Sequence, residues 1–485
     1  MNYSNWLERY PVLQKIGNTA DRLGVEACVV GGFVRDLFLQ RPSKDIDIVC
    51  VGNGIELAQA VAQELGEDIV VHIFKTFGTA MLRWQDNEIE FVGARKESYS
   101  RDSRNPVVTQ GTLVDDQLRR DFTINTLAIR INESQWGELI DDLGGLSDLQ
   151  QKIIKTPLDP GVTFSDDPLR MMRAIRFATQ LRFTIDEVTL MSIQQHAERI
   201  KIISQERITE ELNKIILADI PSKGLKLLFD TGLLKLFFPA LVNLQGKETI
   251  QGHSHKDNFY HTLQVLDNIA KHTNNLWLRW AAILHDIAKP LTKNFSPEIG
   301  FSFHGHEDLG AKLVPKIFRQ LKLPLSEKME YVQKLVRLHL RPIAIAQEVV
   351  TDSAVRRLIY EAGDDLEDLM LLCRADITSN NPTKVKQYLG NFDKVERKVV
   401  EVEERDQVRN LQPVITGDII MQTFQLKPSR VIGEIKAVIK EAILEGEIRN
   451  EYKEAFTYML QVGKSYGLVP ILPIKRLGGT LNNKL

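Results

Sequence analysis

The spacing of apolar and polar residues changes once along the chain. Between Glu26 and Arg130, short β-branched runs such as "ACVV", "DIDIVCV" and "TAMLRW" are separated by turns that contain glycine or asparagine, which predicts strands. The run "IELAQAVAQELG" predicts a helix in this part, and residues 1–24 predict an amphipathic helix before it. From about residue 148 the strand signal almost vanishes and helical periodicity fills the chain. The pattern predicts an α+β fold, in which a small sheet domain precedes all-helical domains.

Soft boundaries near residues 145, 245 and 385 divide this pattern into four predicted domains. They are a mixed head (1–145), a helical neck (146–245), a second helical domain (246–385) and a helical C-terminal part (386–485). One polar stretch of the head, "RKESYSRDSRNPVVTQG", shows no clear periodicity. We predict that it is a mobile loop.

The composition excludes few classes of protein. The chain has 485 residues, a formal net charge of −2, and apolar and charged fractions of 43% and 26%, as expected for a globular protein of several domains. This charge neither requires nor excludes a nucleic-acid partner. The cysteines Cys28, Cys50 and Cys373 lie in apolar contexts without metal-binding spacing, which predicts reduced thiols and a cytoplasmic location. No stretch predicts a membrane span or a signal peptide.

The stretch "CVVGGFVRDLFLQRPSKDIDIV" combines several features of a phosphate and metal site. Alternation along the strand puts Asp45 and Asp47 on one face, and two neighbouring carboxylates repel each other unless a cation lies between them. Mg²⁺ is the expected cation because it prefers carboxylate and phosphate oxygens. Gly31 and Gly32 allow close backbone approach to a phosphate at the start of a helix, and Arg35 adds a guanidinium. The alternative is a surface turn followed by two solvated aspartates.

Metal-assisted phosphoryl transfer usually needs a third carboxylate. Glu90, in "NEIEFVGARKES", lies on a predicted strand and is our first candidate for a catalytic metal ligand. Asp121, in "RRDFTINTLAI", is the competitor, and we expect it to position the nucleotide together with Arg120 and Asn125. Alternatively, Asp121 only caps a helix and Asn125 is solvated.

Five ordered motifs reveal a family resemblance. They are "VVGGFVRDLFLQRPSKDIDIV", "RRDFTINTLAI", "DDLGGLSDL", "SDDPLRMMRAIRFATQL" and "ERITEEL". Their order and spacing resemble the class II tRNA nucleotidyltransferases, the CCA-adding enzymes, whose close relatives are the bacterial poly(A) polymerases. The resemblance is dense over about the first 215 residues. It implies a head of the polymerase-beta type followed by helical neck, body and tail domains. The implied substrates are tRNA, ATP and CTP, and the C-terminal part is expected to contact the tRNA.

The same resemblance gives Asp167 and Arg170 the role of reading the incoming base. An aspartate can accept from the amino group that cytosine and adenine share, while an arginine donates to the neighbouring ring nitrogen. Asp167 followed by Pro168 is also a good helix cap, so a purely structural role stays open. Arg173 and Arg176 extend the basic stretch and are expected to meet the nucleotide or the RNA end.

A second constellation lies in the predicted third domain. It comprises His261, His285, Asp286, His306, His339 and Asp376, all in helical contexts. Adjacent polar ligands in the apolar run "AAILHDIAKP" are costly without a metal, and imidazole suits transition metals. The set resembles the HD phosphohydrolase superfamily, which implies a divalent metal, with Ni²⁺, Mn²⁺ and Mg²⁺ as candidates. A metal that only holds the helices together is the alternative.

Together these features predict an enzyme that adds or repairs the 3′-terminal CCA of tRNA from CTP and ATP, with an additional HD phosphohydrolase activity. A first alternative is a poly(A) polymerase, or an enzyme that adds only CC or only A. A second alternative is an HD phosphohydrolase whose head binds nucleotide without catalysis.

Overall fold

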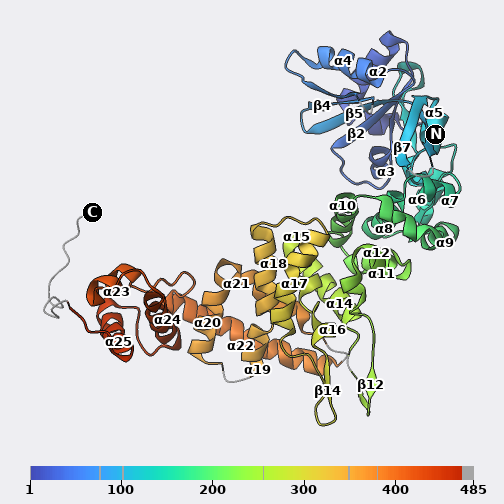
Figure 1. Cartoon of the computed structure of the whole chain (residues 1–485). Helices are drawn as coiled ribbons and strands as arrows, with labels where there is room; N and C mark the ends of the chain where they lie inside the picture. The colour runs from blue at the N-terminus through green and yellow to red at the C-terminus, as the bar shows by residue number, and fades with distance from the viewer. Residues whose placement is uncertain are drawn as a thin grey trace. The chain divides into compact units, whose positions relative to one another are not determined.

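The computed structural model describes residues 2–75, 78–100, 103–254, 256–347, 350–378 and 381–471. The chain forms two compact units. The first unit comprises Met1–Asn243 together with Gln320–Leu323, and the second comprises Leu244–Arg319 together with Pro324–Leu485. Figure 1 shows the sheet in the blue N-terminal part and helices in the green to red parts.

A seven-stranded sheet of order β3-β4-β5-β2-β1-β8-β9 organises the first unit. Its strands are β1 (Ala27–Val30), β2 (Asp45–Cys50), β3 (Val71–Phe74), β4 (Thr79–Trp84), β5 (Asn87–Gly93), β8 (Ala128–Arg130) and β9 (Leu139–Ile140). Only β2 and β5 pair in parallel within this sheet, and the other neighbours are antiparallel. The parallel pair aligns Asp47 with Glu90, so residues far apart in sequence become direct neighbours.

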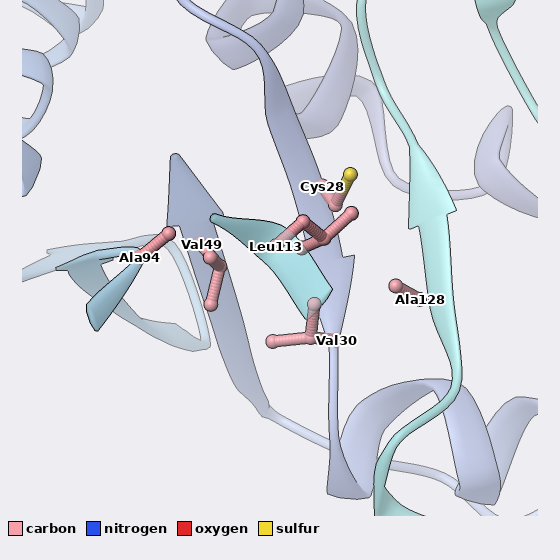
Figure 2. Packing of buried hydrophobic residues seen from close by; sticks show 6 residues of the cluster. All are labelled: Cys28, Val30, Val49, Ala94, Leu113 and Ala128. Carbon is pink, nitrogen blue, oxygen red and sulfur yellow. The ribbon is translucent and has the colours of Figure 1, made fainter. Parts of the chain in front are cut away.

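The sheet buries apolar side chains on both faces. On one face, Cys28 and Val30 of β1 pack with Val49 of β2 and with Leu113 of helix α5 (Leu113–Leu118), as Figure 2 shows. Ile46 and Ile48 of β2 point to the opposite side from Val49 and are fully buried. Both cores fix the strand on which the two aspartates lie.

The N-terminal helices differ slightly from the prediction. The expected lead-in helix is two helices, α1 (Ser4–Leu7) and α2 (Pro11–Leu23), and Pro11 takes the first position of the second one, where a missing N–H is tolerated. Helix α3 (Gly32–Phe38) follows β1 directly. Helix α4 (Gly54–Leu65) begins at Asn53, whose side chain accepts hydrogen bonds from two backbone N–H groups of its first turn.

The prediction of a loop at "RKESYSRDSRNPVVTQG" is wrong, because the structure has strands there. Residues 95–100 and 103–110 form an antiparallel hairpin, β6 (Arg95–Ser100) and β7 (Ser103–Gln110), with Glu97 opposite Val108. The hairpin is a two-stranded sheet of its own and lies outside the seven-stranded sheet. Its sequence is mostly polar and therefore lacks the apolar alternation from which the other strands were predicted.

Helices complete the first unit. They are α6 (Gly145–Gln151), α7 (Pro160–Asp166), α8 (Leu169–Leu181), α9 (Glu187–His196), α10 (Gln205–Ile216), α11 (Pro221–Asp230), α12 (Leu233–Phe237) and α13 (Pro239–Val242). Two-residue strands β10 (Ile153–Ile154) and β11 (Thr184–Ile185) pair among them. Helix α8 buries an apolar stripe and packs against α10 and α11.

The second unit is built almost wholly of helices. They are α14 (Asn258–Ala270), α15 (Leu276–Leu284), α16 (Lys289–Thr292), α17 (His306–Gln320), α18 (Glu327–Leu338), α19 (Arg341–Gln347), α20 (Asp352–Ala362), α21 (Leu366–Asp376), α22 (Pro382–Asp406), α23 (Gly417–Phe424), α24 (Arg430–Glu445) and α25 (Tyr452–Ser465). Two short hairpins interrupt the helices, and the prediction missed them. One pairs β12 (Thr249–Ile250) with β13 (His253–Ser254), and the other pairs β14 (Asn294–Ser296) with β15 (Gly300–Ser302). Across the described ranges, no helix has both the length and the apolar character needed to cross a membrane.

Candidate functional site

Four carboxylates share one face of the sheet in the first unit. Strand register places Asp45 opposite Glu88 and Asp47 opposite Glu90, on the parallel strands β2 and β5. Directly paired residues project to the same side, so the acids gather there while Ile46 faces the core. The structure therefore brings the three predicted catalytic acids together.

A cavity of about 550 Å³ opens over these acids. Its lining includes most of the residues that the sequence singled out in the predicted head and neck, namely Gly32, Arg35, Asp45, Asp47, Glu90, Arg120, Asp121, Asn125, Arg173 and Arg176. The acids come from the strands, whereas the arginines come from α3, α8 and the segment after α5. The cavity thus combines carboxylates from the sheet with guanidinium groups from the helices and from the segment after α5.

Burial and mutual repulsion raise the pKa values of two of these acids. Burial raises the pKa of Asp47, and the neighbouring Asp45 raises it further, although Arg120 and Arg35 oppose both effects. Burial also raises the pKa of Glu90, and Asp47 adds to this increase. Crowded oxygen donors of this kind suit a hard divalent cation, which would relieve their repulsion. The residues present therefore fit a divalent metal.

Gly31 lies close to two residues that line the cavity, Arg120 and Asp47. Its φ angle is +73°, which side-chain-bearing residues rarely adopt. A Cβ built at this position would lie 2.9 Å from Nη1 of Arg120 and 3.1 Å from Oδ2 of Asp47. Only glycine therefore leaves both side chains in place.

A chain of polar contacts connects α3 to α8 along the cavity. Arg35 forms a two-pronged contact with Asp36, with both N–O distances at 2.9 Å, and its Nη1 donates to Oδ1 of Asn125 at 2.8 Å. Asn125 donates to Oδ1 of Asp121 at 2.9 Å, and Nε of Arg173 donates to Oδ2 of Asp121 at 2.7 Å. Each polar group is thereby held in one orientation.

Asp121 differs from Glu90 in its electrostatic state. Burial alone would raise the pKa of Asp121, but Arg173 and the Asn125 amide hold it at about 2. Asp121 is therefore ionised and already bound to an arginine, whereas Glu90 is aligned with Asp47 across the strands. This contrast favours Glu90 as the third metal ligand and Asp121 as a positioning group.

Phe177 of α8 is a cavity residue that sequence reasoning missed. Guanidinium carbons of Arg35, Arg173 and Arg176 lie 5.0, 5.4 and 4.1 Å from its ring centroid, within the range of cation–π attraction. Arg176 also pairs with the buried Glu211 of α10, with 3.2 Å between Nε and Oε2. No local signal marks Phe177 as a cavity residue, because its contact with Arg35 joins distant parts of the sequence.

The proposed base readers have other contacts. Oδ1 of Asp167 accepts from the backbone N–H of Leu169 at 3.1 Å, and Arg170 donates to the carbonyl oxygen of Arg119 at 2.6 Å. Neither residue is among those that line the 550 Å³ cavity. Asp167 thus makes the capping contact that was the structural alternative, and its role with the base stays a prediction.

The six HD residues converge in the second unit. Most lie at helix ends: His285 and His339 directly follow α15 and α18, His306 begins α17, and Asp376 ends α21, while His261 lies in the first turn of α14. Their side chains are nearly buried, with exposed fractions from 0% for His285 to 13% for Asp376. The apolar runs around them explain this burial.

Asp286 lies between two groups of potential ligands. One group is His261, His285 and Asp286, and the other is Asp286, His306 and His339. Oδ2 of Asp286 lies 3.5 Å from Nε2 of His261, while its Oδ1 lies 3.2 Å from Nε2 of His306. Asp376 joins the first group, 2.9 Å from His261. A carboxylate shared in this way can bridge two ions.

The imidazoles are oriented as metal ligands. Nδ1 of His285, His306 and His339 lies 2.7, 2.7 and 2.6 Å from a backbone carbonyl oxygen, so each Nδ1 is the donor. The opposite Nε2 atoms are buried and make no well-aligned hydrogen bond within the part of the chain that the structure describes, and the Nε2 atoms of His285 and His306 lie 3.3 and 3.2 Å from the Asp286 carboxylate. Buried polar atoms rarely stay unsatisfied, so these residues fit a metal.

The charge around His285 supports the same interpretation. Burial alone would lower its pKa, but Asp286 and Asp376 raise the pKa to about 10. The cluster therefore attracts positive charge, which a divalent ion would supply.

Sequence reasoning also missed two supporting residues of this cluster. Nζ of Lys289 lies 2.6 Å from Oδ2 of Asp286, and Oγ1 of Thr378 lies 3.0 Å from Nδ1 of His261. The position of Lys289, one helical turn after Asp286, could have indicated it. Thr378 has no comparable signal, because its partner is distant in sequence.

Comparison with family profiles divides the chain in the same order. The profile of the "Poly A polymerase head domain" matches residues 27–155, and that of the "HD domain" matches residues 258–381. Between them, the profile named "Probable RNA and SrmB- binding site of polymerase A" matches residues 182–244.

Curated relatives extend the similarity over most of the chain. An A-adding tRNA nucleotidyltransferase of Deinococcus radiodurans is 32% identical over 347 residues, which is 69% of this chain and 76% of the relative. A CCA-adding enzyme of Limosilactobacillus reuteri is 40% identical over 237 residues, which is 48% of this chain and 55% of that relative. The Thermotoga maritima CCA-adding enzyme, solved with tRNA, shares the fold at a TM-score of 0.61 and 22% identity, covering 96% of this chain and 99% of that one.

These similarities define a nucleotidyltransferase with a polymerase-type head and an HD domain. The chain belongs to the family of tRNA nucleotidyltransferases that contains the CCA-adding and A-adding enzymes. The predicted family, the α+β head with helical domains and the enzyme class are thereby confirmed.

Proposed function

We propose that the first unit completes the 3′ end of tRNA by adding C, C and A from CTP and ATP. The observation that carries this proposal is the cavity that Asp45, Asp47 and Glu90 line together with several arginines. Such a cavity can hold a nucleoside triphosphate between metal-binding carboxylates and phosphate-binding cations. The names of the relatives support tRNA as the acceptor.

The acids and the cations of the cavity have distinct roles in this proposal. Asp45, Asp47 and Glu90 would hold Mg²⁺, which when bound would neutralise phosphate charge. The tRNA 3′-hydroxyl would then attack the α-phosphate, and the bond to the β-phosphate would break with pyrophosphate as the leaving group. Gly31 and Gly32 let the triphosphate approach the backbone, with Arg35 and Arg120 nearby as cations.

The Asp121–Asn125 contact and Arg173 would orient the nucleotide, and Arg176, held by its ion pair with Glu211, lies nearby in the same cavity. Asp167 and Arg170 would read the amino group and ring nitrogen that cytosine and adenine share. This step needs Asp167 to exchange its capping contact with Leu169 for the base.

Addition of adenosine alone is the second candidate. The Deinococcus radiodurans relative, of which this chain covers 76%, is an A-adding enzyme. Such an enzyme would accept only tRNA that already ends in CC.

Labelled CTP and ATP should be offered separately and together, with Mg²⁺, to three tRNA transcripts that end before CCA, after C and after CC. Two cytidines, one adenosine and then a stop would support the proposal. Incorporation of adenosine only, and only after CC, would support the second candidate. An unbounded A tail on generic RNA would indicate a poly(A) polymerase, and no incorporation would leave the HD domain as the active part.

We also propose that the HD cluster is a divalent-metal phosphohydrolase. His261, His285, Asp286 and Asp376 would hold one ion, and Asp286, His306 and His339 a second. The unsatisfied Nε2 atoms and the shared Asp286 support this proposal. The bound metal would supply an activated water and polarise a phosphoryl group. Ni²⁺, Mn²⁺ and Mg²⁺ are the candidate ions.

Phosphoester hydrolysis by chelator-treated protein, supplied with each ion in turn, tests the HD proposal. Recovery with one of these ions supports it. Retention of metal without hydrolysis of any phosphoester would instead indicate a metal that only holds the helices together.

The domain boundaries at 145, 245 and 385 and the cytoplasmic location remain part of the proposal. Three buried free thiols, Cys28, Cys50 and Cys373, support a reducing compartment. Limited proteolysis, with the fragments identified by mass, tests the boundaries.

A further inference from the structure

Asp116 is a buried acid of the head to which the proposed function gives no role. It lies in α5, its side chain is 0% exposed, and it is not among the residues that line the 550 Å³ cavity. Its partners are the two arginines that follow this helix, Arg119 and Arg120. Arg120 lines the cavity. Asp116 therefore reaches the nucleotide site through Arg120.

Each oxygen of the Asp116 carboxylate is bound by one arginine. Oδ1 accepts from Nε of Arg119 at 2.9 Å and also from Nη2 of that residue. Oδ2 accepts from Nε of Arg120 at 3.0 Å and lies 2.9 Å from its Nη2. Burial alone would raise the pKa of Asp116, but the two guanidinium groups hold it below its ordinary value. The acid is therefore ionised and holds one edge of each arginine.

This contact leaves the Nη1 atom of Arg120 beside the glycine turn. Nη1 lies 2.9 Å from the position of a Cβ built on Gly31, and Oδ2 of Asp47 lies 3.1 Å from the same position. Nη1 also donates to the carbonyl oxygen of Asn125, over a long distance of 3.4 Å. The guanidinium of Arg120 is therefore close to two carboxylates, and it is bound to Asp116.

Asp47 is the carboxylate that Arg120 would bind if Asp116 did not hold it. Among the neighbouring charges, Arg120 has the largest effect on the pKa of Asp47, which it lowers. An arginine paired with Asp47 would occupy carboxylate oxygens that a divalent metal needs. Asp116 opposes this pairing, because it already binds the Nε and Nη2 edge of the guanidinium.

We propose that Asp116 is a positioning residue of the nucleotide site, which holds Arg120 beside Gly31 for the triphosphate and keeps it away from Asp47. The inference rests on the proposed nucleotidyl transfer and adds to it a residue that lies outside the cavity. Arg120 touches the phosphates and Asp47 holds the metal, whereas Asp116 touches neither. When Asp116 loses its charge, Arg120 turns to Asp47 and competes with Mg²⁺.

The test measures, by calorimetry, how much Mg²⁺ the full-length protein needs to bind a non-hydrolysable CTP analogue. Asp116→Asn should raise the half-saturating Mg²⁺ concentration about 10- to 100-fold, because loss of a residue that supports a metal ligand typically costs this much affinity. Asp116→Asn combined with Arg120→Gln should return this concentration to the wild-type value or lower, because the competing cation is gone.

Thr112→Ala is the matched structural control. Oγ1 of Thr112 caps α5 by accepting from the backbone N–H of Asp115, so the change weakens the helix and leaves Asp116 in place. This variant should lose thermal stability and keep the Mg²⁺ requirement of the wild type. A raised requirement in Thr112→Ala would contradict the inference, because a weakened helix would then be sufficient to explain the effect.

An unchanged Mg²⁺ requirement in Asp116→Asn overturns the inference, and so does an increase that Arg120→Gln does not reverse. In both cases the wild type still binds the analogue, so the proposed transfer stands. If Asp116→Asn does not fold, Asp116→Glu keeps the charge but displaces Arg120, and it should raise the requirement too; no increase there overturns the inference. If the wild type does not bind the analogue at any Mg²⁺ concentration, the inference and the proposed transfer fall together.

Discussion

The two candidate metal sites of this chain are built in opposite ways. In the first unit, the ligands are carboxylates on neighbouring strands, and they line a cavity of about 550 Å³ together with arginines. In the second unit, four imidazoles and two carboxylates come from helix ends and are nearly buried, with Asp286 only 2% exposed. The first site is open and offers only oxygen ligands, whereas the second is enclosed and offers both nitrogen and oxygen ligands.

This difference teaches how each site would acquire its metal. The open site leaves room for phosphate oxygens, so the ion can arrive with the nucleotide and leave with pyrophosphate. The enclosed site supplies several protein donors around Asp286, including buried Nε2 atoms without other partners. We therefore expect the HD cluster to keep its metal in the absence of substrate, and the head site to lose it.

The largest effect should come from Asp47→Asn. Removing a charge from the most buried of the three candidate metal ligands of the head should lower nucleotide incorporation by about 10³-fold or more, because metal-assisted charge stabilisation contributes several kcal/mol. HD phosphohydrolysis should not change. Asp86→Asn, at an aspartate whose side chain is 89% exposed, is the control and should leave both activities at the wild-type level. A parallel loss of both activities in the Asp47 variant would contradict the claim that the two metal sites act separately.

The reciprocal change is His306→Gln. It removes one imidazole from the second ligand group and should lower phosphohydrolase activity by about 100-fold, with CTP and ATP incorporation within twofold of the wild type. His272→Gln, at an exposed histidine of the same unit, should have no effect. Undiminished hydrolysis in the His306 variant would exclude a role for the second ligand group.

A smaller effect is expected from Gly31→Ala. The positive φ angle should cost about 1–2 kcal/mol in unfolding free energy, and the added Cβ should displace Arg120 or Asp47. KM for CTP and ATP should therefore rise about tenfold. Gly24→Ala is a matched control, because Gly24 has φ of +67° and nothing within 4 Å of the built Cβ. It should lose less stability than Gly31→Ala, because the ψ of Gly24 is 29°, in the left-handed helical region, whereas that of Gly31 is −138°. Its KM should not change, and equal KM values in the two variants would contradict the cavity geometry.

The smallest effect concerns acid stability. Because the folded-state pKa of Asp121 is about 2, below the ordinary value of about 3.9, its ion pair stabilises the fold above pH 4 and loses this effect as the pH falls towards 2. The difference in unfolding free energy between the wild type and Asp121→Asn should shrink by about 1 kcal/mol from pH 5 to pH 3. Denaturant titrations at each pH measure it. Asp219→Asn, in an exposed ion pair, should show no such slope.

The local parts of the fold could be predicted from the sequence. Period-two alternation identified β2 and the shared face of Asp45 and Asp47, since it depends only on neighbouring residues. The hairpin of β6 and β7 was not predicted, because most of its residues are polar and it lies outside the seven-stranded sheet.

The three-dimensional parts of the sites required the structure. The parallel pairing that aligns Glu90 with Asp47 depends on the order of strands, and no local pattern gives that order. Phe177 is another example, because its three arginine neighbours come from α3 and from α8 itself. The HD ligands were easier to find, since polar residues at the ends of apolar helices stand out in the sequence.

The most direct measurement is the metal content of the protein after loading with Mn²⁺ and gel filtration without nucleotide. Wild type and Asp47→Asn should retain the same number of ions per chain, and Asp286→Asn should retain fewer, because the shared ligand of the HD cluster is lost. Loss of metal in Asp47→Asn with full retention in Asp286→Asn would contradict the account, since the resident metal would then lie in the head.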